Sequence, residues 1–517
     1  MKQRIGEDYA RENKDRLGDV ATGPGMGRDF HIGISPLDTG RALEQAEAVY
    51  GLLNLTGLDG YICDVCFDTT ATNSGCHGGV VILLQHLLGK ALLCCPCRRH
   101  ITELLGKFGL VGATGQRSTA PGDALLQRFC DAWPEIWSHI DYTTINDILV
   151  RFPWDQWEGT ELEAHAREAR EILGQAHLDG TFQRGEYKHA CFLILMALVT
   201  VLRSNTGYRF PDLAKVSNAR FLQRMLYFVM MFLLLQVPAV ARLYSEPEKV
   251  VIRRMAVFCM IYYGPHFLTS TSASRAANND LRLIQKLSSY KMYDNAIASP
   301  VLEVMDRHTE YLSPQLVVLS LANKDLQDQE RSDIANALNV LKEEWGGEEF
   351  QVQEVNRPGP YLASSAGWWA DGMPSLSSFV SVQSFLLFSL LGQQPVDLAW
   401  MERPVSEWEN YPQYLNLQDY VASKHVVNDA LERFIGVTKP CVSNFRNKTN
   451  LKSNLLTTVK VRNAYPHTKK DGVVKTWKTK AEMNQFKPSD LLVREEDQDL
   501  SSNSKDDVGE LSSVSDD

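Results

Sequence analysis

The stretch that decides the fold is 61–100, which reads YICDVCFDTTATNSGCHGGVVILLQHLLGKALLCCPCRRH. Its first seven residues are apolar apart from Asp64 and are rich in strand-forming side chains. Asp68 follows them directly, and a polar turn containing Asn73 comes behind it. This pattern predicts a strand that delivers the Asp68 carboxylate to a turn.

The rest of this stretch predicts a helix, a second strand and a further helix. Apolar residues recur at three- and four-residue spacing over about 77–88, which indicates a helix. A short strand over 91–95 then ends at Pro96, and an amphipathic run begins that places Cys97 and His100 on one face. We therefore expect an α/β sheet with an acid at a strand's carboxyl end, where such sheets usually place their sites.

The chain before this stretch predicts one strand and one helix. Residues 29–35 alternate apolar with small or polar side chains, which is typical of a short strand. A helix follows from Thr39, with Gly57 as its C-terminal stop. Residues 1–28 are polar and glycine-rich without periodicity, so we expect them to be disordered.

The middle of the chain is predicted to be helical. Residues 29–115 thus form the first part of an α/β domain, and 116–405 form a large all-α insertion, so the chain is predominantly helical overall. Two runs, 189–202 and 221–235, are apolar nearly all round and should lie at the centre of a bundle. The longest apolar run, 225–235, falls short of the ~20 residues that cross a bilayer, so we expect no membrane partner.

A closing helix of the α/β domain is expected within 406–440. Its core is 418–435, which reads QDYVASKHVVNDALERFI and has separate apolar and polar faces. The residues of the polar face are His425, Asn428, Asp429 and Glu432.

The C-terminal part of the chain has a strong charge asymmetry. The net charge of the whole chain is −10, yet 433–487 contains thirteen Lys and Arg against two acids, a local balance of +11. We expect a basic segment over 441–494 that follows a DNA backbone, and a disordered acidic tail over 495–517. The alternative for the basic segment is a solvated linker. The candidate DNA contacts are Arg446, Lys448, Lys452, Lys460, Arg462, Lys469 and Lys470.

The ten cysteines mostly stand inside apolar patterns, as reduced and buried thiols do, which favours a reducing compartment, nuclear or cytoplasmic. Cys63 and Cys66 with Cys97 and His100 have zinc-like spacing. However, Cys63 and Cys66 should point to opposite faces of a strand, so packing is the favoured interpretation for both.

Two acids have the type and placement for phosphoryl chemistry. Two-metal sites need several carboxylates from separate elements, because the hard Mg²⁺ ions polarise the phosphate. Asp68 at a strand end and Glu432 on a helix fit that need. Read alone, each acid is more often a cap or a solvated charge, and only their shared context favours a site.

The order of these motifs resembles one family. FDTTATNSG, then CRRH, then a long helical insertion and finally NDALER is similar to the RNase H-like transposases of the hAT type. The resemblance implies Asp68 and Glu432 as the second and third acids of an Asp-Asp-Glu triad with Mg²⁺ as cofactor. It implies Cys97 with His100 as a structural pair, and Asn73, Asn428 and Asp429 in support.

The chain departs from this family at its start. The family's first acid lies on a first strand that precedes two more strands, whereas only 29–35 has strand character before the predicted helix. We therefore expect an incomplete RNase H-like sheet and a transposase-derived protein without strand-cleaving activity. Binding of DNA or protein, including self-association, is the expected role, with no small-molecule substrate. The alternatives are a helical interaction scaffold, or an active Mg²⁺-dependent transposase completed by an upstream segment.

Overall fold

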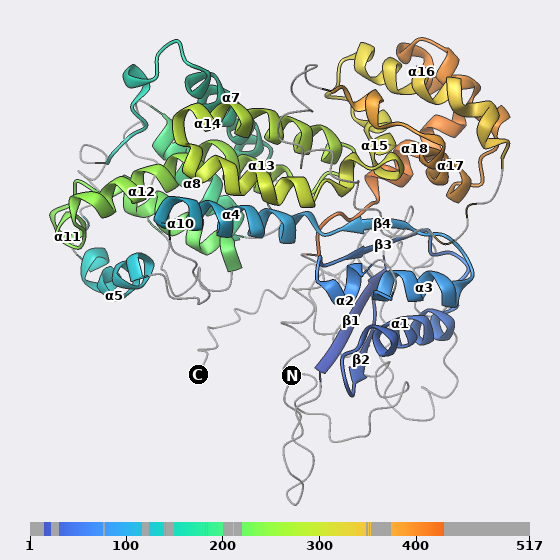
Figure 1. The fold of residues 1–517 in the computed structure, drawn as a ribbon, viewed down its shortest axis with the longest axis horizontal. Coiled ribbons are helices and arrows are strands. Elements are labelled where there is room, and N and C mark those ends of the chain that lie inside the picture. Colours follow the sequence, from blue (N-terminus) through green and yellow to red (C-terminus); the bar gives the residue numbers. More distant parts are fainter. Residues whose placement is uncertain are drawn as a thin grey trace, which may run out of the picture.

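The structure is a computed structural model, and it describes most of the chain up to Asn428. The described residues are 15–21, 30–75, 78–115, 124–138, 140, 149–180, 182, 185–199, 210, 220–347, 350, 352 and 374–428. Within them, a small α/β part lies below two groups of helices, one at each side of Figure 1. We call these groups the first and the second helical lobe, in chain order.

The strands form two small sheets of two strands each. β1 (Asp15–Ala21) pairs antiparallel with β2 (Phe30–Leu37), and the register shifts immediately after Asp19. β3 (Asp64–Phe67) pairs parallel with β4 (Leu93–Pro96). The described strands therefore do not form a single RNase H-like sheet, although the predicted strands 29–35, 61–67 and 91–95 overlap β2, β3 and β4.

Helices join and cover these strands. α1 (Ala42–Thr56) links β2 to β3, and α3 (Val80–Leu88) follows the short α2 (Ala71–Ser74) and leads to β4. α1 ends at Gly57, whose φ of 69° is left-handed, so the predicted stop is confirmed. The members of a small core beneath the hairpin are Ala21, Ile32, Leu53, Leu84 and Leu92, with Val65 packed against them. One core thus joins the two sheets.

The prediction that 1–28 is wholly disordered is wrong for part of that range. Residues 15–21 form β1, although their sequence, DRLGDVA, has no alternation of apolar and polar side chains. The strand owes its conformation to backbone pairing with β2 and to the burial of Ala21, which are contacts between distant residues.

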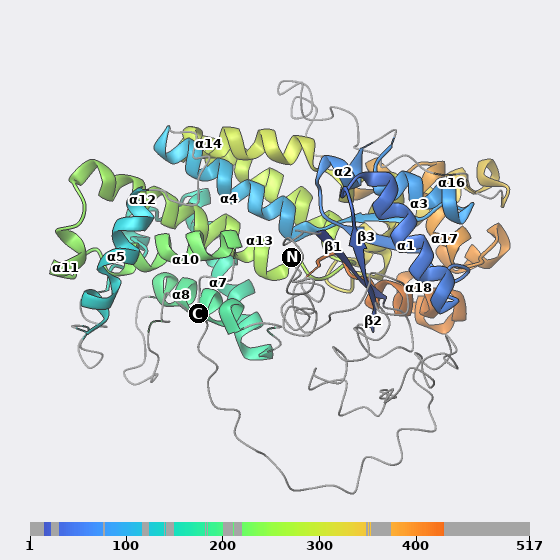
Figure 2. The ribbon, with the colours of Figure 1, turned by 90° about the horizontal axis from the view of Figure 1, so that it is seen from below.

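The first helical lobe grows directly out of β4. It begins with α4, a helix of 17 residues that lies beside α14 in both Figure 1 and Figure 2. Its elements are α4 (Arg98–Thr114), α5 (Ala124–Ser138), η1 (Trp154–Gln156), α7 (Glu161–Asp179), α8 (Gly185–Leu198), α10 (Arg220–Leu233), α11 (Pro238–Ala241), α12 (Glu246–Phe258), the π-helix η2 (Cys259–Tyr263), α13 (Gly264–Thr269) and α14 (Ala276–Arg307). The two apolar runs expected at its centre overlap α8 and α10, and most of the side chains that the structure describes in them are buried.

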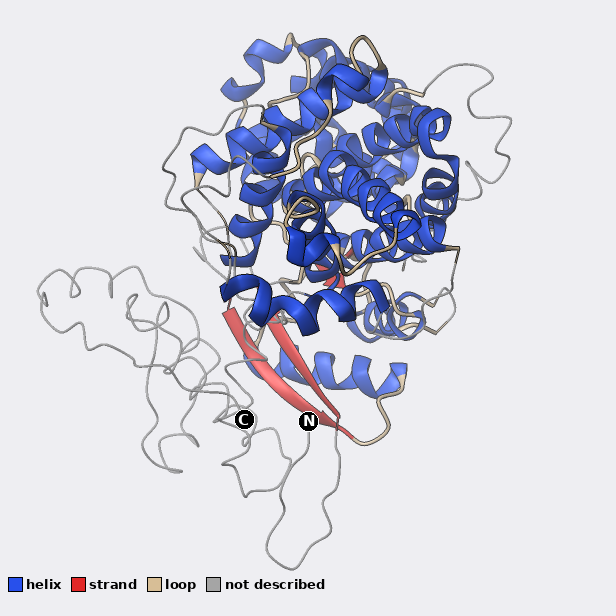
Figure 3. Ribbon diagram, turned by 90° about the vertical axis from the view of Figure 1, so that its left-hand side faces the viewer, coloured by secondary structure: helices blue, strands red, loops and turns tan. Residues whose placement is uncertain are grey.

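The second helical lobe is made of shorter elements. They are η3 (Glu310–Leu312), α15 (Pro314–Val317), η4 (Val318–Ala322), α16 (Asp328–Trp345), η5 (Leu376–Phe379), η6 (Val382–Phe385), α17 (Leu386–Leu390), η7 (Pro395–Glu402), η8 (Val405–Asn410) and α18 (Pro412–Ala422). Figure 3 shows the helices of both lobes stacked on one side of the strands. A continuous core runs from Leu93 and Cys95 of β4 through both lobes to Val426. No described helix is both long enough and apolar enough to span a bilayer.

The closing helix is shorter than the sequence pattern predicts. α18 ends at Ala422, and residues 424–428 are not helical, so His425 and Asn428 do not share a helical face. The reason is tertiary: the Arg98 amide donates to the Val426 carbonyl at 2.8 Å, which binds this backbone to the end of β4 instead. We call residues 424–428 the closing segment.

Candidate functional site at the ends of two parallel strands

Asp68 lies where the sequence predicts, directly after the carboxyl end of β3. Its Oδ1 accepts the Thr70 amide at 3.0 Å and the Asn73 side-chain amide at 2.8 Å. Burial opposes ionisation of this carboxyl, but the bonds from Thr70, the charge of His100 and the bond from Asn73 outweigh it and lower its pKa. Asp68 is therefore an oriented carboxylate, and Asn73 is the residue that orients it.

Cys97 marks the corresponding end of β4. It stands at the N-cap of α4, and its amide donates to the Phe67 carbonyl at 2.7 Å, which extends the β3–β4 pairing by one residue. Its thiol contacts Asn428: the Asn428 amide donates to Sγ at 3.3 Å, and the Asn428 Oδ1 also lies 3.3 Å from Sγ. These residues are 331 positions apart, so the chain returns to the strand ends after the whole helical insertion.

The sulfur of Cys97 is polarised by its neighbours. Burial raises the pKa of this thiol, but hydrogen bonds with Cys66 and His100 and the charge of His100 lower it well below the usual value. The Cys66 thiol donates to the same sulfur, so its own pKa is raised well above the usual value, first by that bond and then by burial. The predicted Cys97 and His100 pair is thus in contact.

The structure brings together five of the seven residues predicted for the catalytic and supporting positions. They are Asp68, Asn73, Cys97, His100 and Asn428. Glu432 and Asp429 lie outside the described residues, and so do the candidate DNA contacts Arg446, Lys448, Lys452, Lys460, Arg462, Lys469 and Lys470. The contact between Asp68 and Glu432 therefore stays a prediction.

The metal-binding potential of this site rests on one carboxylate. In the described part of the chain, no three His, Cys, Asp or Glu side chains gather in a way that could hold a metal ion. A hard Mg²⁺ ion prefers oxygen ligands, and Asp68 offers them, whereas the neighbouring Cys97 and His100 offer softer atoms. Mg²⁺ at Asp68 and Glu432 remains the predicted arrangement for an active site.

Cys63 and Cys66 pack against the main core, which was the interpretation favoured from the sequence. Both are partly buried, and the Cys63 thiol lies 3.8 Å from the Leu390 carbonyl in the second lobe. All the cysteines that the structure describes are free thiols.

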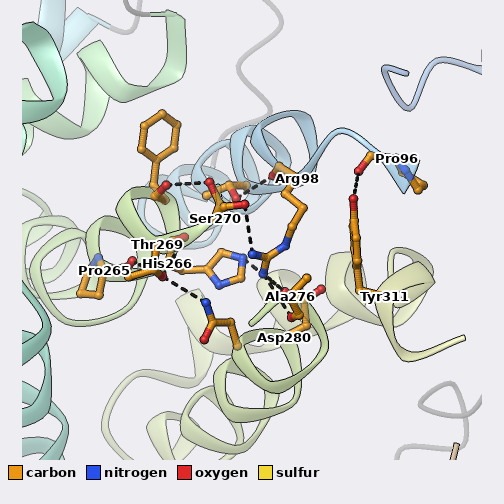
Figure 4. A network of polar contacts seen from close by, with 12 residues as sticks. Pro96, Arg98, Pro265, His266, Thr269, Ser270, Ala276, Asp280 and Tyr311 are labelled. Atoms are coloured by element: carbon orange, nitrogen blue, oxygen red, sulfur yellow. Dashed lines mark hydrogen bonds and ion pairs between the residues drawn. The ribbon is translucent and has the colours of Figure 1, made fainter. Parts of the chain in front are cut away.

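Two arginines next to the site, Arg98 and Arg99, are buried, and their burial was not predicted from the sequence. Arg98, with 1% of its side chain exposed, forms an ion pair with Asp280 of α14, and its guanidinium also donates to the Ser270 carbonyl at 3.3 Å. Figure 4 shows this guanidinium beside His266, whose Nε2 lies 3.7 Å from the Asp280 carboxylate. The network ties the first turn of α4 to α14 and to the end of α13, within the first helical lobe.

The same figure shows Tyr311 of η3 reaching the end of β4. Its hydroxyl donates to the Pro96 carbonyl at 2.6 Å, so the second lobe also holds this strand end. Arg99 lies over the ring of Phe267 at 3.8 Å and over that of Tyr187 at 4.4 Å. Both lobes thus fix the backbone that carries Cys97 and His100.

A signal for Arg98 was present in the sequence. Arg98 stands at the head of the stripe Ile101, Thr102 and Leu105, all of which are buried. A charged residue in line with the apolar face of a helix predicts a buried partner of opposite charge. Asp280, its partner, lies too far along the chain for any local pattern to identify it.

Comparison with protein-family models, with curated proteins and with solved structures finds no match for this chain. The resemblance to hAT-type transposases therefore rests on the order of short motifs alone.

Proposed function

We propose that this chain is a transposase-derived protein that binds DNA without cutting it. The observation that supports this best is the return of the chain to the strand ends. Asp68 follows β3, Cys97 follows the parallel β4, and Asn428 comes back to Cys97 across the helical insertion. The resemblance implies this arrangement, in which the last acid comes from a segment beyond the insertion.

The proposal of binding without cleavage follows from the number of acids. Two-metal cleavage needs several carboxylates around the ions, and loss of one bridging ligand cripples such a site. The two strands before α1 pair with each other as a hairpin. Asp19, the acid inside β1, has a carboxyl whose pKa is raised by burial, which disfavours the ionised form that binds a metal ion. Neither observation supplies the first acid of a triad.

The DNA-binding half of the proposal rests on charge. The chain passes from Asn428 into a segment with thirteen basic residues and two acids, a composition suited to a phosphate backbone. Mobility of a labelled DNA duplex on gels, measured at increasing salt, tests this. We expect strong retardation that falls steeply as salt rises, and a shallower dependence when the seven candidate Lys and Arg are replaced by Gln. Lys324→Gln with Lys342→Gln, on the second lobe, is the control for loss of charge elsewhere.

A second assay tests the absence of cleavage. Supercoiled plasmid incubated with the chain in Mg²⁺ or Mn²⁺ should stay intact. Nicking by the wild-type chain that is lost in both Asp68→Asn and Glu432→Ala would show instead that the site is catalytically active.

A helical interaction scaffold is the competing proposal. The observation in its favour is the continuous core through both lobes, which gives one large helical body. A scaffold predicts no retardation of the duplex at any salt concentration, so the same gel assay separates the two.

A further inference from the structure

Three cysteines lie on one face of the β3–β4 pair. Cys66 of β3 is the register partner of Cys95 of β4. The Cys97 amide donates to the Phe67 carbonyl at 2.7 Å, so Cys97 continues the pairing two positions beyond Cys95. Because side chains alternate along a strand, Cys66, Cys95 and Cys97 share a face. This face is turned toward the main core, since Cys95 belongs to that core and Cys66 packs against it.

Cys66 and Cys97 are in contact on this face. The Cys66 thiol donates to the Cys97 sulfur, which singles out Cys97 rather than Cys95 as its partner. Adjacent strands lie about 4.8 Å apart, and disulfides bridge Cα atoms up to about 6.8 Å apart. Cys97 stands at the turn from β4 into α4, outside the ladder, so a small backbone adjustment brings its sulfur within bonding distance of Cys66.

The surroundings of Cys97 favour its oxidation. Burial opposes ionisation of this thiol, but hydrogen bonds with Cys66 and His100 lower its pKa well below the usual value. Its place at the N-cap of α4, a helix of 17 residues, also favours an anion. Cys97 is fully buried, so iodoacetamide should alkylate it slowly, whereas hydrogen peroxide is hardly larger than water. A polarised thiol beside a second thiol is typical of redox-sensing cysteines.

We infer that Cys66 and Cys97 form a redox switch, in which peroxide joins them as a disulfide and thereby releases Asn428 from the end of β4. The Cys97 thiolate attacks a peroxide oxygen, which gives a sulfenic acid and hydroxide. The Cys66 sulfur then attacks the Cys97 sulfur and displaces its hydroxyl as water. Two thiols and one peroxide thus give one disulfide and two water molecules. This chemistry does not depend on DNA binding by the chain.

Asn428 is released because its partner in β4 is the Cys97 sulfur. The Asn428 amide donates to that sulfur at 3.3 Å. In a disulfide the sulfur has no charge, accepts hydrogen bonds weakly and is drawn toward Cys66. The start of the closing segment keeps its own contact, because the Lys424 ammonium pairs with the Asp64 carboxylate. Oxidation is therefore expected to free the end of the closing segment and to leave its start in place.

Oxidation of the full, folded chain with hydrogen peroxide tests the disulfide. The remaining thiols are blocked with N-ethylmaleimide, and trypsin then cuts after Lys90 and Arg98, which places Cys97 on the peptide 91–98. Fragment mass spectrometry should show this peptide linked through Cys97 to Cys66. The link should be absent in Cys66→Ser and in Cys97→Ser. It should form as in the wild type in Cys95→Ser, the matched control on the same face.

Hydrogen exchange tests the release of Asn428. Loss of one hydrogen bond should make the Asn428 amide exchange about tenfold faster after oxidation, and dithiothreitol should reverse the change. The Lys424 amide, which donates to the Val421 carbonyl at 3.2 Å, should exchange at an unchanged rate. Peroxide should leave the exchange of Asn428 unaltered in Cys66→Ser, where no disulfide forms.

The outcomes are distinct. A wild-type chain that keeps both thiols in excess peroxide, or that links Cys66 to Cys95, overturns the inference. A link to Cys97 with unchanged exchange at Asn428 overturns it as well, because the disulfide then releases nothing. Loss of helical circular dichroism on oxidation also contradicts a reversible switch. If Cys66→Ser is unfolded before oxidation, Cys66→Ala takes its place.

Discussion

Asp19 combines a titratable carboxyl with a position inside a strand. Its side chain as a whole is only half-buried, but its Oδ2 is covered and has no hydrogen-bond partner among the described residues. Burial raises the pKa of this carboxyl to about 7, from an ordinary value of 3.8. Local sequence did not predict this burial, because DRLGDVA has the composition of a polar loop. Burial of Asp19 results from the β1–β2 pairing.

The stability of the hairpin should therefore depend on pH. A carboxyl whose pKa is higher in the folded state stabilises that state when protonated, an effect complete below pH 3.8 and lost as pH rises through about 7. We expect a loss on the order of 2 kcal/mol between about pH 4 and pH 8, reduced for the partial exposure of the side chain. Hydrogen exchange of the β1 and β2 amides, corrected for the intrinsic effect of pH, measures it.

Asp19→Asn provides the comparison. The amide cannot ionise, so exchange in this variant should be slower than in the wild-type chain at pH 8, with little difference near pH 4. An equal pH dependence in the two chains would show that another group is responsible. Asp59→Asn removes a carboxyl outside the hairpin and should leave the pH dependence as it is.

At the scale of elements, local sequence signals predicted several ends of helices and strands. Gly57 was predicted to end a helix and does so in a left-handed conformation, because a glycine reaches that region without steric cost. The Asp68 strand end and the start of α4 after Pro96 were also predicted from local sequence. The end of α18 was not predicted. The ion pair of Lys424 with Asp64 joins residues 360 positions apart, and the periodicity of apolar side chains carries no information about such a contact.

α4 shows a second long-range constraint, a row of glycines at every third position. A Cβ on Gly106 would lie 3.0 Å from the Tyr263 ring, and one on Gly109 would lie 2.8 Å from the Phe258 ring. At Gly112 it would lie 2.0 Å from the backbone carbonyl oxygen of Ala296 in α14. Glycine inside a helix costs about 1 kcal/mol relative to alanine, so the row reflects close packing.

Alanine substitutions along α4 should therefore follow a defined order. Gly112→Ala is expected to destabilise the chain by about 3 kcal/mol, because a backbone carbonyl cannot move without shifting α14. Gly109→Ala should cost about 1 kcal/mol, and Gly106→Ala about zero, since rings can rotate and alanine favours the helix. Urea unfolding measures the three differences.

Gly174 of α7 is the matched control for these variants. A Cβ there would meet nothing within 4 Å, so Gly174→Ala should stabilise the chain by about 1 kcal/mol through helix propensity alone. Equal effects at Gly112 and Gly174 would mean that the α4–α14 contact is less close than described.

At the scale of the whole molecule, the strand ends are held by both helical lobes at once. Arg98, which follows β4 at the start of α4, pairs with Asp280 of α14 in the first lobe, and the Pro96 carbonyl accepts from Tyr311 of the second lobe. Burial and the negative charge of Glu310 raise the pKa of Asp280 although Arg98 lowers it, so the removal of this carboxylate from water opposes its attraction to the arginine. The ion pair thus adds little to the free energy of unfolding, and its main effect is to fix the position of the β4 end relative to α14.

A double-mutant cycle on this pair tests that view. Asp280→Leu alone or Arg98→Met alone should destabilise the chain by about 3 to 5 kcal/mol, because each leaves a buried charge without its partner. Arg98→Met with Asp280→Leu should cost much less than the sum, since two apolar side chains can share the space. Lys324→Met breaks the exposed Lys324–Glu409 pair and should have little effect. If the double variant also loses protection of Cys97 from iodoacetamide while remaining folded, the buried pair positions the strand end, whereas full protection would assign that role to Tyr311 and the closing segment.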